Sequence, residues 1–401
     1  GAGNSPARTL RRVNARRLAA HSPRAVRNVL IRYGWDEVRA DAAAGSLEPV
    51  VVLLEELAPD TIEALVRHNR QLGLDLLTGE GWVLLAGSRS RLGVFARPWV
   101  LPPELVELGT AVGQSLPAEP PELWRTARDP IKLDHPIILG ILNVTPDSFS
   151  DGGRFTAVDA ALAHAARLVE SGADIIDLGG ESTRPGAEPV SAEQEIARVI
   201  PVLKALVREH PGFPISVDTV KAEVAEAALD AGAAIINDVS GLRLDAAMGA
   251  VVSRHRGGLV VMHSRGGVGE MARTELGDYG DDPVGRIIRE LSRSLDRART
   301  AGVEADAIVL DPGLGFAKTA EQSLMVLDQL AAFVALGRPL LVGPSRKRFL
   351  GVPAGAPVET RDCATAAACV LAHERGALLF RVHDVAMARE ALRLAAALRG
   401  P

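Results

Sequence analysis

Eight short apolar runs recur after residue 135, and they constrain the fold more than any other feature of the chain. The runs are PIILGIL, ADIIDLG, PISVDT, AAIINDV, GLVVMH, DAIVLDP, PLLVGPS and ALLFRVHD. Helical patterns such as AVDAALAHAARLVESG separate them. Continuously apolar strands that alternate with helices predict a parallel sheet covered on both faces. Eight such units over about 250 residues predict a closed (β/α)8 TIM barrel.

An open, doubly wound sheet is the structural alternative to a barrel. Sheets of that kind that bind dinucleotides carry a glycine fingerprint directly after the first strand. Here the first strand is followed by NVTPDSFSDGG, residues 143–153, which lacks that spacing. The sequence therefore favours the barrel.

The N-terminal part of the chain predicts a separate, small α/β domain over residues 1–115. All four tryptophans lie before residue 130. We predict helices over SPRAVRNVLIRYGW, APDTIEALVRHNRQLG and PPELVELGTAVGQSL, and strands over PVVVLLEEL, GWVLLAGS and RLGVFARPWVL. The proline-rich and charged residues 116–135 predict a linker, and the barrel is expected over residues 136–401. No motif assigns the small domain a role.

Composition points to no macromolecular partner. The 401 residues carry a formal net charge of −5, and the arginines near the start are more typical of a solvated helix face than of an RNA-binding patch. No apolar segment approaches the ~20 residues of a membrane span, and the start GAGNSPARTLRR lacks a signal core. Cys363 and Cys369 are too few for a disulfide framework, so we expect a cytoplasmic protein.

Polar side chains gather where the predicted strands end. They are Asn143, Asp177, Asp218, Asn237, Asp238, His263, Asp311, Ser345, Lys347, Arg381 and His383. A barrel brings all eight strand ends to one mouth, where barrel enzymes keep their active sites. The glycine-rich loop after the first strand is predicted to overhang this mouth as a lid.

Two carboxylates at this mouth have two interpretations. Asp218 ends the third predicted strand and Asp311 the sixth. A cation such as Lys347 would neutralise one of them, because an unpaired buried carboxylate is costly. Alternatively, they recognise a flat heterocycle with adjacent N–H donors, since a carboxylate accepts two parallel hydrogen bonds. Asn237 would add both donor and acceptor capacity.

The motif RVHD predicts an anion site. Arg381 and His383 are two residues apart on a strand and therefore point to one face. With Asn143 they are expected to hold a phosphate or diphosphate bridged by Mg²⁺, which needs only one or two protein ligands in such sites. A surface ion pair between Arg381 and Asp384 is the alternative. The histidines lack the spacing of a zinc site.

Two glycine-framed loops add hydroxyls and cations. GGESTRPGAE places Thr183 and Arg184 after the second strand, and VGPSRKRFLG places Ser345 and Lys347 after the seventh. Thr183 as a turn cap and a solvated Arg184 are the alternatives for the first loop. Taken alone, the second loop describes a generic barrel phosphate site. Both cysteines fall in an alanine-rich helical pattern and are interpreted as small core residues rather than nucleophiles.

Together these segments resemble the dihydropteroate synthases. The matching segments are GILNVTPDSFSDGG, GGESTRPGA, ISVDT, INDVSG, VMHSRG, DPGLGFAKT, GPSRKRFLG and RVHD, between residues 135 and 400. The ordered set is far more specific than any one motif. The resemblance implies a transferase of folate biosynthesis that condenses 6-hydroxymethyl-7,8-dihydropterin diphosphate with 4-aminobenzoate. Its products would be 7,8-dihydropteroate and diphosphate.

The resemblance also implies roles for individual residues. The pterin site would comprise Asp218, Asn237, Met262, Asp311, Phe316, Gly343 and Lys347. The aminobenzoate site would comprise Thr183, Arg184, Pro185 and Ser345. The diphosphate would be bound by Asn143, Thr183, Arg381 and His383, with Mg²⁺ on Asn143. The catalytic set would be Asn143, Asp218, Asp311, Lys347, Arg381 and His383.

In such enzymes the diphosphate leaves first, and the aromatic amine attacks a cationic pterin methylene. Loops carrying Asp147 and Phe149, and Arg184, would close over both small-molecule substrates and exclude water. The STRPGAEPVS loop has no insertion, so the resemblance implies a sulfonamide-sensitive enzyme. Ala317 stands where the family often has glycine. The family also implies a homodimer, by analogy.

Two other functions compete with this one. A pterin-binding methyltransferase acting on methyltetrahydrofolate and a corrinoid protein would share the Asp and Asn contacts, but it has less reason to keep SRK and RVHD. A non-catalytic pterin-binding protein would not need the lid and diphosphate residues. These motifs favour the synthase.

Overall fold

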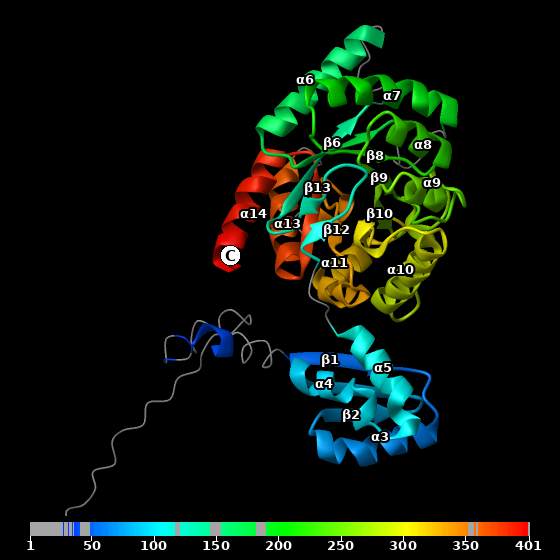
Figure 1. The fold of residues 1–401 in the computed structure, drawn as a ribbon, viewed down its shortest axis with the longest axis vertical. Helices are drawn as coiled ribbons and strands as arrows, with labels where there is room; N and C mark the ends of the chain where they lie inside the picture. Colours follow the sequence, from blue (N-terminus) through cyan, green and yellow to red (C-terminus); the bar gives the residue numbers. More distant parts are fainter. Residues whose placement is uncertain are drawn as a thin grey trace, which may run out of the picture. The chain divides into compact units, whose positions relative to one another are not determined.

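The computed structural model describes residues 27, 31, 34, 36–40, 49–116, 121–144, 154–181, 190–351, 357 and 360–399. The chain divides into two compact units after Leu116. Figure 1 shows both units with their helices and strands. Within the described ranges, no helix has the length and apolar content that a membrane span needs.

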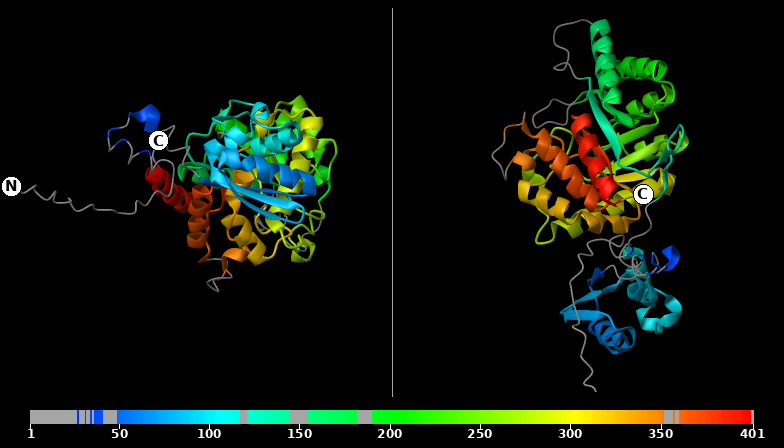
Figure 2. Two further views of the ribbon diagram at one scale, coloured as in Figure 1. Left: turned by 90° about the horizontal axis from the view of Figure 1, so that it is seen from below. Right: turned by 90° about the vertical axis from the view of Figure 1, so that its left-hand side faces the viewer.

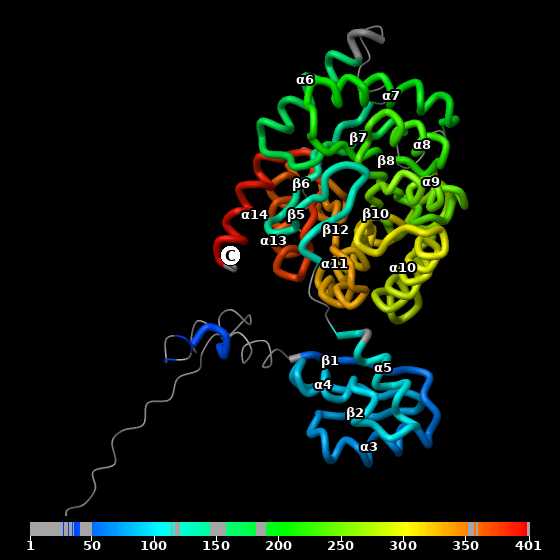
Figure 3. The backbone as a smooth tube through the Cα atoms, viewed as in Figure 1, coloured from blue at the N-terminus to red at the C-terminus, as the bar shows by residue number. Residues whose placement is uncertain are grey.

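The second unit contains a closed barrel of eight parallel strands, which confirms the predicted architecture. The strands are β6 (Ile137–Asn143), β7 (Ile175–Gly179), β8 (Ile215–Asp218), β9 (Ile235–Asp238), β10 (Gly258–Met262), β11 (Ile308–Asp311), β12 (Leu340–Val342) and β13 (Ala377–Val382). The barrel closes where β13 pairs with β6, with Leu379 beside Ile137 and Val382 beside Gly140. Figure 3 draws the backbone of this unit as a tube and labels several of the strands, from β6 to β12.

Helices form the outer layer of the barrel. They are α6 (Arg154–Glu170), α7 (Ala192–Glu209), α8 (Ala222–Asp230), α9 (Met248–Arg254), α10 (Pro283–Thr300), α11 (Ala320–Asp328), α12 (Arg348–Gly351), α13 (Asp362–Glu374) and α14 (Val385–Arg399). Capping boxes start α7 at Ser191 and α11 at Thr319, where each hydroxyl accepts a backbone N–H three residues ahead. The last helix, red in Figure 2, lies outside the barrel beside α13 and β6.

Alternation along the strands divides the barrel residues into an outward and an inward set. The outward residues pack against the helices and include Ile138, Ile176, Val217, Ile236, Val261, Leu310, Val342 and Phe380. The inward residues of the lower layers form one apolar cluster of Ile137, Leu139, Ile175, Ile235, Val260, Val309, Leu341 and Leu379. The next inward positions toward the carboxyl ends are polar, which places Asp177, Asn237 and Arg381 at the mouth of the barrel.

The predicted linker is wrong for residues 121–135, which belong to the barrel unit. The short strands β4 (Leu123–Trp124) and β5 (Ile131–Lys132) pair in antiparallel fashion. Trp124 is fully buried in the inward apolar cluster, and its Nε1 donates to the carbonyl of Ala307 at 2.8 Å. The prolines and charges of this stretch mark turns rather than a flexible connection. The hairpin covers the apolar interior at the amino ends of the strands.

The first unit is a three-stranded antiparallel sheet with helices. Its described elements are β1 (Pro49–Leu54), α3 (Pro59–Leu72), β2 (Asp75–Gly79), β3 (Trp82–Ser88), α4 (Arg89–Phe95) and α5 (Val106–Ser115), with short 3-10 turns at Pro98–Val100 and Pro103–Leu105. The strand order is β1-β3-β2. Val52, Leu54, Val83 and Leu85 face the buried side of the sheet. The helix predicted over residues 22–35 lies largely outside the described residues.

Two predictions for the first unit are wrong. The stretch RLGVFARPWVL is not a strand, because α4 and a 3-10 turn occupy it. The Ser88 hydroxyl caps α4 by accepting the Arg91 N–H at 3.4 Å, and Leu92 and Phe95, three residues apart, are both fully buried. Strand β2 was not predicted, since its five residues gain their pairing only from β3.

Candidate active site

Polar side chains from six strands meet at the carboxyl end of the barrel. They are Asn143 of β6, Asp177 of β7, Asp218 of β8, Asn237 of β9, Asp311 of β11 and Arg381 of β13. The strand register sets Asp218 directly beside Asn237 and places Gly179 on its other side. The predicted gathering of polar strand ends around one mouth is therefore present in the fold.

Arg381 bridges two carboxylates across this mouth. Its Nε donates to Oδ2 of Asp177 at 2.5 Å, and its Nη2 donates to Oδ2 of Asp218 at 2.9 Å. The alternative of a surface pair with Asp384 is wrong, because that carboxylate instead accepts the Met387 N–H at 3.0 Å. The guanidinium thus faces carboxylates, one of which the family resemblance assigns to the pterin.

Two buried acceptor atoms at the mouth have no hydrogen-bond partner among the described residues. They are Oδ1 of Asp177 and Oδ1 of Asn237. The Asn237 amide nitrogen donates to Oδ2 of Asp177 at 3.3 Å, so the remaining oxygens are the ones left over. An unsatisfied buried acceptor costs about 1–3 kcal/mol, so the arrangement suits a ligand that brings N–H donors.

Asp177 was noted as a polar strand end but was given no role in the sequence analysis. Its side chain is completely buried and contacts both Arg381 and Asn237. The alternation of inward and outward side chains along the strand could have identified it. Asp177 lies two residues before Gly179, on the inward face of β7, and Gly179 pairs with Asp218.

Burial favours the neutral forms of two acids and one base at the mouth. Burial raises the pKa of Asp218 to about 7, although Arg381 opposes the shift. Burial also raises the pKa of Asp311 above its ordinary value, against the opposing charge of Lys347. Conversely, burial lowers the pKa of Lys347 to about 8. The mouth therefore combines an acid, Asp218, and a base, Lys347, whose pKa values lie close to physiological pH.

Lys347 does not neutralise a carboxylate by direct contact, so that interpretation is wrong. Its Nζ donates to the carbonyl of Leu314 and lies 4.2 Å from the centroid of the Phe316 ring. No carboxylate of the described residues lies within 4.0 Å of this nitrogen. Asp311 instead accepts a hydrogen bond from the backbone N–H of Gly313, at 2.7 Å.

An apolar patch borders the acidic groups. Met262 and Phe316 belong to a small cluster with Val220, Val239 and Met271. Met262 pairs with Asp311 in the register of β10 and β11, so the apolar and acidic contacts predicted for one ligand are neighbours. A flat heterocycle needs both kinds of contact.

Ser345 and His383 meet on the cationic side of the mouth. The Ser345 hydroxyl lies 2.9 Å from Nδ1 of His383, and the His383 N–H donates to that hydroxyl at 3.1 Å. Two residues predicted for different ligands, aminobenzoate and diphosphate, are therefore in direct contact. Gly343 lies beside Arg381, where an added Cβ would be 3.7 Å from the arginine Cβ.

Several predicted site residues lie outside the described residues. They are Thr183, Arg184 and Pro185 of the second loop, and Asp147 and Phe149 of the first. Their assignment to the aminobenzoate site, the diphosphate site and the lid stays a prediction.

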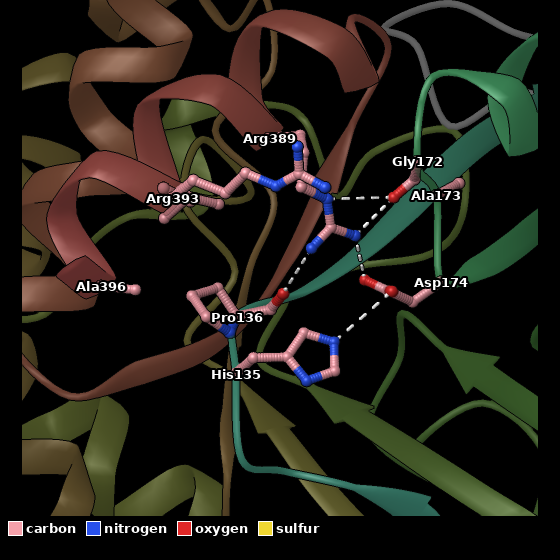
Figure 4. A pocket seen from close by; sticks show the side chains of 9 residues that line it. His135, Pro136, Gly172, Ala173, Asp174, Arg389, Arg393 and Ala396 are labelled. Atoms are coloured by element: carbon pink, nitrogen blue, oxygen red, sulfur yellow. Dashed lines mark hydrogen bonds and ion pairs between the residues drawn. The ribbon is translucent and has the colours of Figure 1, made fainter. Parts of the chain in front are cut away.

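A hollow of about 410 Å³ lies at the opposite, amino end of the strands (Figure 4). Arg389 lines it and donates to the carbonyls of Pro136, at 3.1 Å, and Gly172. The same guanidinium pairs with Asp174. Because its donors already have protein acceptors, this hollow has the character of a structural bridge rather than a ligand site.

Comparison with known proteins agrees with the geometry. A family described as pterin binding enzyme matches residues 139–383. The dihydropteroate synthase of Synechocystis sp. is 47% identical over 262 residues, which are 65% of this chain and 89% of that protein. The dihydropteroate synthase of Mycobacterium leprae is 44% identical over 266 residues, or 65% of this chain and 92% of that protein.

Solved structures give the same result. Xanthomonas albilineans dihydropteroate synthase with 4-aminobenzoic acid is 43% identical, with a TM-score of 0.64, and the match covers 70% of this chain and 99% of that one. The same enzyme in complex with 7,8-dihydropteroate is 41% identical, with a TM-score of 0.62 and coverage of 70% and 99%. The chain with this barrel and this polar mouth therefore belongs to the dihydropteroate synthases, within the family of pterin-binding enzymes.

Proposed function

We propose that this protein condenses 6-hydroxymethyl-7,8-dihydropterin diphosphate with 4-aminobenzoate to form 7,8-dihydropteroate and diphosphate. One observation carries the proposal: the barrel mouth holds two cations and buried acceptors that have no hydrogen-bond partner in the described part of the chain. The acceptors are on Asp177 and Asn237, and the cations are Lys347 and Arg381. A pterin supplies the missing donors, and a diphosphate uses the positive charge.

The pterin ring would lie between the acidic strand ends and the apolar patch. Asp218, Asp311 and Asn237 would accept hydrogen bonds from ring and amino N–H groups. Lys347 would donate to a ring acceptor from its seat beside Phe316. These contacts orient the ring so that its methylene carbon faces the cationic side of the mouth.

Arg381 would exchange partners when the substrate binds. In the structure its guanidinium donates to Asp177 and Asp218. An incoming pterin would replace it at Asp218, and the guanidinium would then be able to contact the diphosphate together with His383 and Asn143. As the carbon–oxygen bond breaks, these groups neutralise the charge that grows on the leaving diphosphate.

The amine of 4-aminobenzoate then attacks the cationic methylene and loses a proton. The carboxylates of Asp177 and Asp218 would stabilise this cation from within the barrel. Ser345 would contact the aminobenzoate together with Thr183, Arg184 and Pro185. We infer that sulfonamides compete with 4-aminobenzoate for this site.

Asn143 would hold the Mg²⁺ ion. An amide oxygen is a hard ligand, and Mg²⁺ bound to phosphate oxygens needs only one or two ligands from the protein. Oδ1 of Asn143 lies over Gly179, where an added Cβ would approach it to 3.2 Å, so the glycine keeps that oxygen accessible. No group of three or more acidic, histidine or cysteine side chains suited to a metal occurs among the described residues, which fits an ion held mainly by substrate. When bound, Mg²⁺ would supply charge neutralisation for diphosphate.

An assay of the full chain with both substrates and Mg²⁺ tests the function. We expect dihydropteroate and diphosphate to form in equal amounts, and only when both substrates are present. Tight pterin binding without product would instead support the non-catalytic binding protein. Methyl transfer from methyltetrahydrofolate to a corrinoid protein would support the methyltransferase.

Assembly and location follow from the family alone. We infer a cytoplasmic homodimer. Light scattering coupled to size-exclusion chromatography would give a mass of twice 42.3 kDa if the homodimer is right.

A further inference from the structure

A completely enclosed lysine lies behind the pterin site and has no part in the reaction proposed above. The side chain of Lys318 is 2% exposed. Its Nζ is 2.9 Å from Nδ1 of His263, 2.9 Å from the carbonyl oxygen of Gly313 and 3.0 Å from that of Phe316. Burial lowers the pKa of Lys318 well below its ordinary value, and the two carbonyls can only accept, so Nζ donates a hydrogen to each of them.

His263 connects this lysine to the helix layer. Because the ionised carboxylate of Glu290 can only accept, Nε2 of His263 carries the ring proton and Nδ1 accepts from Lys318. That nitrogen lies 2.9 Å from Oε2 of Glu290 on α10. Arg265 pairs with the other oxygen of Glu290 at 2.5 Å. Burial, together with Lys318, lowers the pKa of His263 to about 3, so the imidazole stays neutral at physiological pH.

The two carbonyls bound by Lys318 belong to the loop 312–317 that follows β11. The loop is held at its far end as well, where the Ala317 N–H donates to the Met271 carbonyl at 2.6 Å and the Tyr279 hydroxyl donates to the Ala317 carbonyl at 2.9 Å. Ala317 has a left-handed φ of 48°, which explains why glycine suits this position. Gly313 allows no side chain, since a Cβ would lie 1.9 Å from the His263 carbonyl oxygen.

The same loop contacts the Lys347 side chain along its length. The Leu314 carbonyl accepts from Lys347 Nζ, and the Phe316 ring lies under that nitrogen at 4.2 Å. The backbone at Gly315 runs along the lysine stem, where a Cβ would lie 3.0 Å from Cδ of Lys347. Any movement of the loop therefore moves the Lys347 ammonium.

We propose that Lys318 is a positioning residue of the pterin site, which holds the loop 312–317 against His263 and thereby fixes Lys347 where the pterin binds. It does not touch the ligand. The inference rests on the proposed function, because it takes Lys347 to be a pterin contact. Without Lys318 the Phe316 carbonyl would have no donor among the described residues, and the Gly313 carbonyl would keep only the Phe316 N–H at 3.1 Å, so an apolar replacement releases the loop.

A double-mutant cycle on the full chain tests the inference, with the dissociation constant for dihydropterin diphosphate as the readout. The variants are Lys318→Met, Lys347→Ala and the double variant, with Lys204→Met as control because Lys204 lies exposed on α7. We expect Lys318→Met to weaken pterin binding about tenfold, as for a small displacement of a binding group. In the Lys347→Ala background the same substitution should have no further effect, because Lys318 acts on pterin binding only through Lys347.

The outcomes separate the inference from the function. A wild-type protein that does not bind dihydropterin diphosphate would remove the function itself. A wild-type protein that binds it, with Lys318→Met indistinguishable from the control or with independent losses in the double variant, would overturn the positioning role alone. If Lys318→Met fails to fold, His263→Leu tests the positioning role instead, because it removes one hydrogen-bond partner of Lys318. We expect about threefold weaker binding that vanishes in the Lys347→Ala background, and unchanged affinity would overturn the inference.

Discussion

Each end of the barrel contains an arginine paired with carboxylate. The two ends differ in whether acceptor atoms remain without a hydrogen-bond partner. At the amino end, Arg389 meets one carboxylate, Asp174, and the carbonyls of Pro136 and Gly172. At the carboxyl end, Arg381 meets two carboxylates, and an oxygen of Asp177 remains without a partner among the described residues. Among the described residues, Arg389 and its acceptors satisfy one another at the amino end, whereas the Arg381 cluster at the carboxyl end carries acceptors in excess.

This difference distinguishes a structural contact from a binding site. Buried polar groups are normally paired, so unpaired ones mark a place where folding free energy is given up. Burial, and to a lesser extent the nearby carboxylate of Asp177, raises the pKa of Asp218, an arrangement that a structural bridge would not need. Substitutions at the two ends should therefore change different quantities.

The largest effect is expected at the carboxyl end. Lys347→Ala or Asp311→Asn should lower kcat/KM for the pterin substrate on the order of 100-fold or more, because each removes a contact to the reacting ligand. The melting temperature should change little. Steady-state kinetics and circular dichroism melts measure the two quantities. Undiminished pterin binding in either variant would remove that residue from the site.

The amino end should respond in stability when Trp124 is lost. A chain that begins at residue 117 keeps the hairpin, and we expect it to fold and turn over like the full chain. A chain that begins at residue 131 loses the buried Trp124 and should be less stable by about 3 kcal/mol. Urea denaturation of the two truncations gives the difference. Equal stability would mean that the hairpin does not close the barrel interior, and an insoluble longer chain would show that the first unit is needed.

Arg389→Met should also act on stability alone. Removing the guanidinium leaves Asp174 without its cation and two carbonyls without donors, at a cost of about 2 kcal/mol. The pterin KM should stay at the wild-type value, since the site is at the other end of the strands. A raised KM with unchanged stability would contradict the distinction between the two ends.

The smallest effect is expected from pH. On the proposed function, Asp218 accepts from the pterin as a carboxylate, and burial raises its pKa to about 7, so kcat/KM should fall as the pH drops below 7. Lys347 donates as an ammonium with a pKa of about 8, so the rate should also fall above pH 8. Each limb should change about tenfold per pH unit.

The variant Asp218→Asn tests the assignment of the acidic limb. In this variant the acidic limb should disappear while the basic limb stays. Because burial raises the pKa of Asp218 above its ordinary value of 3.8, ionising it weakens the fold as the pH rises toward 7, and the variant should lose that dependence. An acidic limb that persists would assign it to another group.

Local patterns predicted some elements and missed others for identifiable reasons. The strand β6 was predictable because PIILGIL can be buried on both sides only in a parallel sheet. The helix α4 was not, because RLGVF fits two periods and only burial of Leu92 and Phe95 selects one. Trp124 was placed in the linker instead of the barrel unit, since its partner Ala307 is 183 residues away in the chain.

The sequence by itself determined the number of strands, their parallel order and the polar character of their carboxyl ends. These follow from local periodicity, which acts over a few residues. The closed tertiary structure alone decided that Arg381 pairs with Asp177, 204 residues away, and that Lys318 meets His263, 55 residues away. Charges so far apart in the chain become neighbours only when β13 closes on β6 and adjacent strand ends converge, and no local pattern encodes which partner each will meet.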